Sequence, residues 1–273
     1  MSTRINQTKA PRTSIRNATE EDYEAISDVV VDAFVHDPVY NYFGSLKEFM
    51  PKDKNTKEKE NLRKWSKFLL SLCVLSGGRV VVMVEHSVEG EGEDEDGEGR
   101  NEGERKERER IVGFAEWLPP NKRPALWHVR TMFKAGIVGM VRAWGMSGLL
   151  RCGFEWLDGT ERTMLKAFRK RELGNPDATW YLFQIAVIQE CQGKGYMSKL
   201  IREGFDNAPG ATFTLDATTA SSRDKYAHVG FEVVGVVPLG RGKSNSKGLE
   251  AKGESAVGVD AYSMIKLPNG GSR

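Results

Sequence analysis

Apolar side chains recur with helical spacing in two stretches near the N-terminus. A stripe over residues 23–34 follows Thr19, which suits a helix N-cap, and acidic residues after Thr19 suit a first helical turn. This pattern predicts a helix that ends near Pro38. A second stripe, over residues 58–75, places leucine, tryptophan and phenylalanine on one face and predicts another amphipathic helix.

Short runs of aliphatic, β-branched and aromatic residues predict strands along the rest of the chain. A short first strand is expected before the N-terminal helix, and two others are bounded by glycine or proline. The predicted strands cover residues 14–17, 79–85, 111–118, 181–188, 212–216 and 259–267.

The segment 87–110 is acidic and of low complexity. It holds eleven acidic and five basic residues, a net charge of −6, with five glycines and almost no apolar side chain. Such a segment cannot bury enough apolar surface to offset the entropy of ordering it, so we predict a disordered insertion. It would enlarge the turn of a hairpin formed by residues 79–85 and 111–118, because closure entropy rises only slowly with loop length. Capture of basic partners by the acidic tract is the alternative interpretation.

Residues 125–150 are rich in leucine, methionine, tryptophan and glycine, with Arg130, Lys134 and Arg142 between them. Three interpretations fit this stretch: packing into the core, a roof over a substrate pocket, and a basic amphipathic helix on a membrane surface. Core packing is favoured, because the glycines weaken a long continuous helix. Residues 240–258, rich in glycine, serine and lysine, predict a flexible loop.

The overall composition is typical of a globular cytoplasmic protein, with the nucleus as the alternative compartment. Hydrophobic residues make up 39% and charged residues 29% of the 273 positions, and the net charge is +2. No run of about 20 apolar residues predicts a membrane span, and no apolar run near the start predicts a secretory signal. Cys73, Cys152 and Cys191 form no closely spaced pair. We therefore expect no disulfide framework and no metal site, and we expect no nucleic-acid partner.

A strand, a glycine-bearing turn and a helix follow one another over residues 181–205. Unpaired N–H groups at a helix start suit a bound pyrophosphate, and glycine lets the backbone approach it closely. The GxxxxGK[ST] string of a P-loop does not occur. Gly193 and Gly195, with Asp216 further on, leave dinucleotide binding as an alternative, although residues 189–192 separate the strand from the first glycine.

Two linked motifs resemble one enzyme family. The run IAVIQECQGKGYMSKLI at residues 185–201 resembles the acyl-CoA signature of the GCN5-related N-acetyltransferases (GNATs), Q/R-x-x-G-x-G/A after a strand, through Gln192 and Gly195. The run LDATTASSRDKYAHVGFEVV at residues 215–234 resembles the segment that follows in this family, through Tyr226 and a Gly-Phe pair. The order and separation of the two motifs also match the family.

A third likeness and two departures complete the comparison with the family pattern. The string AF-x-x-DP at residues 33–38 is similar to members of the family. The chain departs from the signature at Met197, where glycine or alanine is usual, and at Gln189, where proline is frequent. We expect the Met197 side chain to point into the core while its N–H still donates to the ligand.

The resemblance implies an α/β (α+β) fold: a mixed central sheet flanked by helices and splayed open between strands 181–188 and 212–216, with acetyl-CoA in the gap. One domain over residues 14–268 is expected, between a disordered N-terminus, 1–13, and a short tail, 269–273. The resemblance also assigns two groups of backbone contacts. Ala186, Val187 and Ile188 would pair with the pantetheine arm, and Gln192, Gly193, Lys194, Gly195, Tyr196 and Met197 would hold the pyrophosphate.

The function implied by the resemblance is acetyl-CoA-dependent N-acetylation, with direct transfer to a small-molecule or peptide amine in a ternary complex. Tyr226 would be the acid that protonates the leaving thiolate, and Glu116 is the candidate base, with Asp37 as another candidate. The alternatives are a non-catalytic acyl-CoA-binding or interaction module on the same fold and, third, a dinucleotide-binding protein. The sequence does not specify the acceptor or the oligomeric state.

Overall fold

The computed structural model describes residues 12–51, 54–88, 107–124 and 128–268. Within them, seven strands form one sheet in the order β1-β2-β3-β4-β5-β7-β6. Neighbouring strands are antiparallel except for β4 and β5, which are parallel. The strands are β1 (Arg12–Asn17), β2 (Arg79–Val88), β3 (Glu107–Leu118), β4 (Trp180–Val187), β5 (Phe213–Ala217), β6 (Glu232–Leu239) and β7 (Val259–Lys266).

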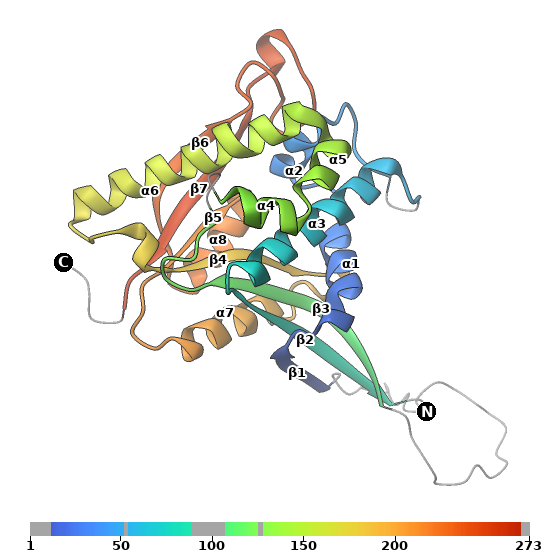
Figure 1. Ribbon diagram of the computed structural model, residues 1–273, viewed down its shortest axis with the longest axis vertical. Coiled ribbons are helices and arrows are strands. Elements are labelled where there is room, and N and C mark those ends of the chain that lie inside the picture. Colours follow the sequence, from blue (N-terminus) through green and yellow to red (C-terminus); the bar gives the residue numbers. More distant parts are fainter. Residues whose placement is uncertain (1–11, 52–53, 89–106, 125–127, 269–273) are drawn as a thin grey trace, which may run out of the picture.

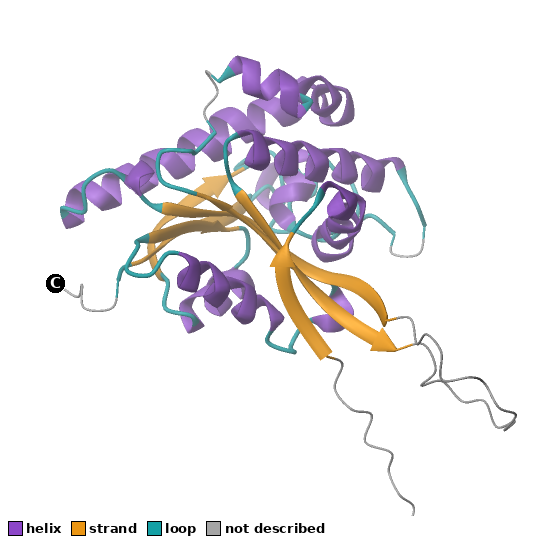
Figure 2. Ribbon diagram, turned by 60° about the horizontal axis from the view of Figure 1, so that its bottom comes forward, coloured by secondary structure: helices purple, strands orange, loops and turns teal. Residues whose placement is uncertain are grey.

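The sheet opens between β4 and β5. These strands pair only from Trp180↔Phe213 to Leu182↔Leu215, whereas β4 stays paired with β3 as far as Val187. The last part of β4 therefore has one edge without a neighbouring strand. This arrangement confirms the predicted mixed, splayed sheet, and Figure 2 shows helices on both of its faces.

Eight α-helices surround the sheet in the described part of the chain (Figure 1). In Figure 1, α1 and α3 lie beside the β2–β3 hairpin, and α6 runs along β6, with which it is in contact. The helices are α1 (Tyr23–Phe34), α2 (Pro38–Phe43), α3 (Lys57–Leu75), α4 (Val129–Ala135), α5 (Ile137–Leu150), α6 (Asp158–Arg171), α7 (Tyr196–Asn207) and α8 (Ala220–His228). The first two predicted helices match α1 and α3.

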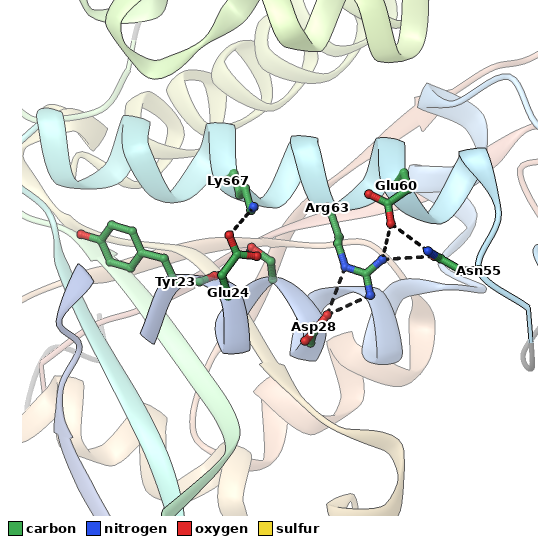
Figure 3. Close-up of polar contacts among 8 residues, drawn as sticks. Tyr23, Glu24, Asp28, Asn55, Glu60, Arg63 and Lys67 are labelled. Carbon is green, nitrogen blue, oxygen red and sulfur yellow. Dashed lines mark hydrogen bonds and ion pairs between the residues drawn. The ribbon is translucent and has the colours of Figure 1, made fainter. Parts of the chain in front are cut away.

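Helices α1 and α3 are joined at their exposed edge by the polar contacts in Figure 3. Arg63 bridges Asp28 at 2.9 Å and Glu60 at 2.8 Å, and Lys67 meets Glu24 at 2.5 Å. Exposed ion pairs of this kind contribute only about 0–1 kcal/mol each. The two helices are therefore held mainly by the buried apolar stripes that the sequence predicts.

Helix α7 covers the opposite face of the sheet through a close approach to β3. Trp117 of β3 is 1% exposed, and a Cβ added at Gly204 of α7 would lie 2.4 Å from its ring. Because side chains alternate along a strand, the neighbouring Glu116 points to the other face, toward α1 and α3. Trp117 and Gly204 thus fix the distance between α7 and the sheet.

We expect Gly204→Ala to lower the free energy of unfolding by about 1–3 kcal/mol, because the added methyl group overpacks the Trp117 contact. Urea unfolding followed by circular dichroism measures the change. Gly139→Ala in α5 is the matched control, since a Cβ there meets nothing within 4 Å and the helix gains up to about 1 kcal/mol from alanine. Equal changes in the two variants would contradict the packing role of Gly204.

The stretch 125–150 forms two helices. The helix is interrupted at Gly136, where φ is +98°, so that α4 ends and α5 begins there. Helix α5 is itself kinked at Gly145, where φ is +69°. Glycine adopts these angles without the cost that a Cβ would bring, so the expected weakening of a long helix is confirmed. Ala135, Met140 and Trp144 are buried in the main hydrophobic core, as the favoured core-packing interpretation predicts. Met132, Ile137 and Leu149 line a cavity, which also matches the roof interpretation. Residues 125–127 lie outside the described part. No described helix is long and apolar enough to cross a membrane.

Two predicted loops need comment. The acidic insertion was predicted over residues 87–110. Its two ends belong to strands, because β2 continues to Val88 and β3 begins at Glu107. The rest of the predicted insertion, 89–106, lies outside the described residues. The segment 240–258, predicted as a flexible loop, makes long-range backbone contacts. Asn41 Nδ2 donates to the carbonyl of Lys247 at 3.0 Å, and the N–H of Glu250 donates to the carbonyl of Leu46 at 2.8 Å.

Candidate active site

A cavity of about 980 Å³ occupies the gap between β4 and β5. Its walls come from the open part of β4, the first turn of α7, the start of α8 and the segment that joins α1 to α2. Helices α3, α4 and α6 and the two ends of α5 close the other side. One cavity therefore connects the glycine turn after β4 with the region around Tyr226 on α8.

The glycine turn presents backbone N–H groups to this cavity. Gly193 and Gly195 have φ of +81° and +79°, the left-handed region in which glycine is favoured, and Gly195 is the N-cap of α7. The six N–H groups of residues 193–198 meet no hydrogen-bond acceptor among the described residues. Together with the positive end of the α7 dipole, they form a site suited to an anion such as a phosphate.

Several residues of the predicted cradle have other partners. The N–H of Gln192 donates to the carbonyl of Gln189 at 3.2 Å, and its side-chain Nε2 donates to the carbonyl of Val187 at 3.1 Å. Gln192 therefore ties the turn to the open edge of β4. The N–H of Ile188 donates to Val112 of β3, and Lys194 Nζ lies 3.4 Å from Glu85. Neither Ile188 nor Lys194 lines the cavity, whereas Ala186, Val187, Gln192, Gly193, Gly195, Tyr196 and Met197 do.

The departure from the signature at Met197 leaves the N–H cluster intact. The Met197 side chain is half-buried and packs against the hydrophobic core, while its N–H is one of the six without an acceptor. Tyr196 is held by its hydroxyl, which donates to Glu85 at 2.7 Å. Burial and this hydrogen bond raise the pKa of Tyr196 to about 12.

Asp37 lies in the same cavity and is only 8% exposed. Its Oδ1 accepts from the N–H groups of Val39 and Tyr40 at 2.9 and 3.2 Å, so it caps α2, and Pro38 fills the first helical position. Its Oδ2 accepts from the hydroxyl of Thr218 at 2.5 Å. Burial raises the pKa of Asp37 to about 6, and these hydrogen bonds limit the rise. Asp37 thus has the pKa of a general base that works near neutral pH.

Tyr226 faces the cavity from α8. Its ring packs against Phe231 at 6.1 Å between centroids, and no described residue forms a hydrogen bond with its hydroxyl. Burial, with the nearby charge of Asp37, raises the pKa of Tyr226 above its usual value of about 10. The phenol therefore keeps its proton throughout the pH range in which Asp37 ionises.

Glu116, the first candidate base, does not line the cavity. It is 0% exposed under α1 and α3, and neither of its carboxylate oxygens has a hydrogen-bond partner among the described residues. Burial without any cation raises the pKa of Glu116 well above its ordinary range. Glu116 lies on the face of β3 that α1 and α3 cover, so it does not open into the cleft.

Asp216 is a second acid in the cavity, and its oxygens are occupied. The hydroxyl of Tyr181 donates to Oδ2 at 2.9 Å, and that of Ser263 donates to Oδ1 at 2.6 Å. Arg123 lies over the Tyr181 ring at 4.3 Å and bonds to Thr214 and Thr179, which closes this end of the cavity.

Comparison with known proteins identifies the fold. No protein-family model matches the chain. The structure covers 96% of this chain and 99% of a solved structure from Corynebacterium glutamicum, described as histone acetyltransferase HPA2 and related acetyltransferase, with a TM-score of 0.53 and 19% identity. The fold is that of the GCN5-related N-acetyltransferases. The splayed β4–β5 pair matches the opening of the sheet that the resemblance to GNATs implied.

Two further matches to N-acetyltransferases are weaker. An uncharacterised N-acetyltransferase of Schizosaccharomyces pombe is 26% identical over 121 residues, which are 44% of this chain and 47% of that protein. The matched part therefore spans about half the length of this curated relative. The structure of arylalkylamine N-acetyltransferase 2 from Aedes aegypti aligns with a TM-score of 0.48 and 13% identity, over 94% of this chain and 100% of that one.

Among the residues that the structure describes, no group of three or more His, Cys, Asp or Glu side chains has the arrangement of a metal site.

Proposed function

We propose that this protein is an acetyl-CoA-dependent N-acetyltransferase that transfers the acetyl group directly to an amine while both substrates are bound. The observation that carries the proposal is a single cavity with an anion site at one end and a buried base beside a protonated phenol at the other. The anion site is the N–H cluster of residues 193–198, and the base and phenol are Asp37 and Tyr226. The open edge of β4 joins them.

The residues of the cleft fit acetyl-CoA. A pyrophosphate needs several N–H donors in a glycine-bearing turn, and residues 193–198 supply them at the start of α7. A pantetheine arm carries amide groups that pair with a strand edge, and β4 has such an edge beyond Leu182. When bound there, acetyl-CoA supplies an acetyl group activated as a thioester.

Asp37 and Tyr226 divide the proton transfers between them. Asp37 accepts the proton that the acceptor nitrogen loses, and its hydrogen bonds from Thr218 and the α2 backbone keep the carboxylate oriented. Tyr226 holds a proton at its hydroxyl and donates it toward the sulfur that leaves. A phenol is a weaker acid than a thiol, with pKa values of about 10 and 8.5, so Tyr226 acts chiefly as a hydrogen-bond donor until negative charge develops on sulfur.

We expect Tyr226→Phe to lower kcat about 10- to 100-fold, the cost of removing one hydrogen bond to a charged group. The affinity for acetyl-CoA should stay within twofold, roughly the change expected where no contact is lost. Release of free CoA, followed with a thiol reagent, gives kcat, and calorimetry gives the affinity. Tyr262→Phe is the matched control, because Tyr262 on β7 does not line the cavity. Equal turnover of Tyr226→Phe and the unaltered protein at every pH would contradict the acid role.

A further inference from the structure

The cavity offers a buried carboxylate to an external cation. Asp37 is 8% exposed, and its contacts are with neutral donors: two backbone N–H groups and the hydroxyl of Thr218. Within the described residues, no lysine or arginine forms an ion pair with it. A buried carboxylate is strongly stabilised by a cation, because water cannot screen or solvate the charge there. The ammonium group of an acceptor amine is such a cation.

The wall beside Asp37 is aromatic. Tyr40 and Phe43 follow Asp37 on α2, and Trp65 of α3 and Trp156 of the helical turn before α6 complete the wall; all four line the cavity. The Phe43 ring lies at the centre, with centroid distances of 6.3 Å to Tyr40, 6.2 Å to Trp65 and 6.0 Å to Trp156. Rings at these distances present apolar surface with favourable edge-to-face geometry for another ring.

The charged residues of α3 stay out of this wall. Although α3 carries several lysines and glutamates, the cavity residues it contributes are Trp65, Phe68, Leu69 and Leu72. A second ammonium group placed against this wall would be desolvated without a counter-charge, which is costly. Three other acids line the cavity and have partners: Asp158 pairs with Arg162 at 2.8 Å, Asp177 lies 3.8 Å from Arg123, and Asp216 accepts from Tyr181 and Ser263. Among the described residues, this leaves Glu161 of α6 as the lining acid for the second ammonium group of a diamine.

We propose that the acceptor is a primary amine with one ammonium group on a short chain that ends in an aromatic or bulky apolar group. The ammonium would lie at Asp37 and the apolar group against Tyr40, Phe43, Trp65 and Trp156. This inference rests on the proposed acetyl transfer, and it specifies the class of amines that receive the acetyl group.

The test compares phenethylamine, ethylamine and putrescine as acceptors in the CoA-release assay. Burial of one aromatic ring predicts that kcat/KM for phenethylamine exceeds that for ethylamine about 30-fold or more. Putrescine should be no better than ethylamine. Transfer without this preference, or with putrescine favoured, overturns the inference and leaves acetyl transfer standing.

A second measurement applies if no amine is acetylated, an outcome that would overturn the proposed function. Tryptophan fluorescence reports binding without turnover, because Trp65 and Trp156 line the cavity. Saturable quenching by phenethylamine but not by putrescine would sustain the proposed specificity of the cavity. No quenching by phenethylamine would overturn it.

Paired variants separate recognition from stability. Trp156→Leu should reduce the ratio of kcat/KM for phenethylamine to that for ethylamine about tenfold, since part of the ring contact is lost. Trp144→Leu is the matched control: Trp144 stacks on Trp65 at 4.8 Å but does not line the cavity. It should lower the melting temperature and leave the ratio unchanged. An unchanged ratio in a folded Trp156→Leu protein would overturn the assigned wall.

Discussion

Replacing Gly195 with glutamate is expected to weaken acetyl-CoA binding by at least about 100-fold. The backbone at Gly195 has φ of +79°, where a residue with a Cβ is strained by roughly 1–2 kcal/mol. The new carboxylate would also stand at the N-cap of α7, among the N–H groups that we assign to the pyrophosphate. Like charges there oppose the ligand directly, so the loss should appear in a calorimetric titration with acetyl-CoA.

Gly210→Glu is the matched control for this substitution. Gly210 has φ of +76°, and, as at Gly195, an added Cβ would meet nothing within 4 Å, but Gly210 does not line the cavity. The backbone strain and the added charge are therefore similar, and only the position differs. Equal affinities of the two variants for acetyl-CoA would show that the turn at Gly195 is not the pyrophosphate site.

Asp37→Asn is expected to lower kcat by about 100-fold or more, the range typical of a lost general base. The asparagine keeps the shape and the helix cap of the aspartate but cannot take up the proton. In the unaltered protein, kcat/KM should fall as the pH drops below about 6, because protonation of Asp37 removes the base. The variant should lack this acidic limb, which a pH series of the CoA-release assay measures.

Two comparison variants test whether the fall of kcat/KM at acidic pH, the acidic limb, reflects protonation of Asp37. Asp28→Asn, on the exposed side of α1, should leave both kcat and the limb unchanged, since Asp28 contacts Arg63 instead of the cavity. Thr218→Val should move the limb to higher pH, because the Thr218 hydrogen bond lowers the pKa of Asp37. An acidic limb that persists in Asp37→Asn would assign the base to another residue.

The anion site could be predicted from the sequence because it is local. A strand, two glycines that adopt left-handed backbone angles and a helix start lie within one short segment, so their order along the chain determines the geometry. The same holds for α1, whose first turn and apolar stripe are contiguous. The side-chain contact of Gln192 could not be predicted from the sequence. Its amide donates back to the carbonyl of Val187.

The sequence could not show whether Glu116 or Asp37 lies at the cavity, because this depends on which face of the sheet stays open. Both residues are carboxylic acids close to predicted strands or helix ends, so their sequence context does not separate them. The packing of α1 and α3 buries Glu116 beneath the helices and leaves Asp37 at the cavity. The 240–258 segment shows the same limit. Gly248 lies against the carbonyl of Pro38, where a Cβ would clash, and such a contact across the chain has no local signal.

The most direct test of the central claim is a calorimetric titration of the unaltered 273-residue chain with acetyl-CoA, with NAD as the comparison ligand. The anion site at residues 193–198 and the open edge of β4 predict saturable binding of acetyl-CoA at one site and no binding of NAD. Binding of NAD alone, or of neither ligand, would contradict the assignment of this cavity to acetyl-CoA.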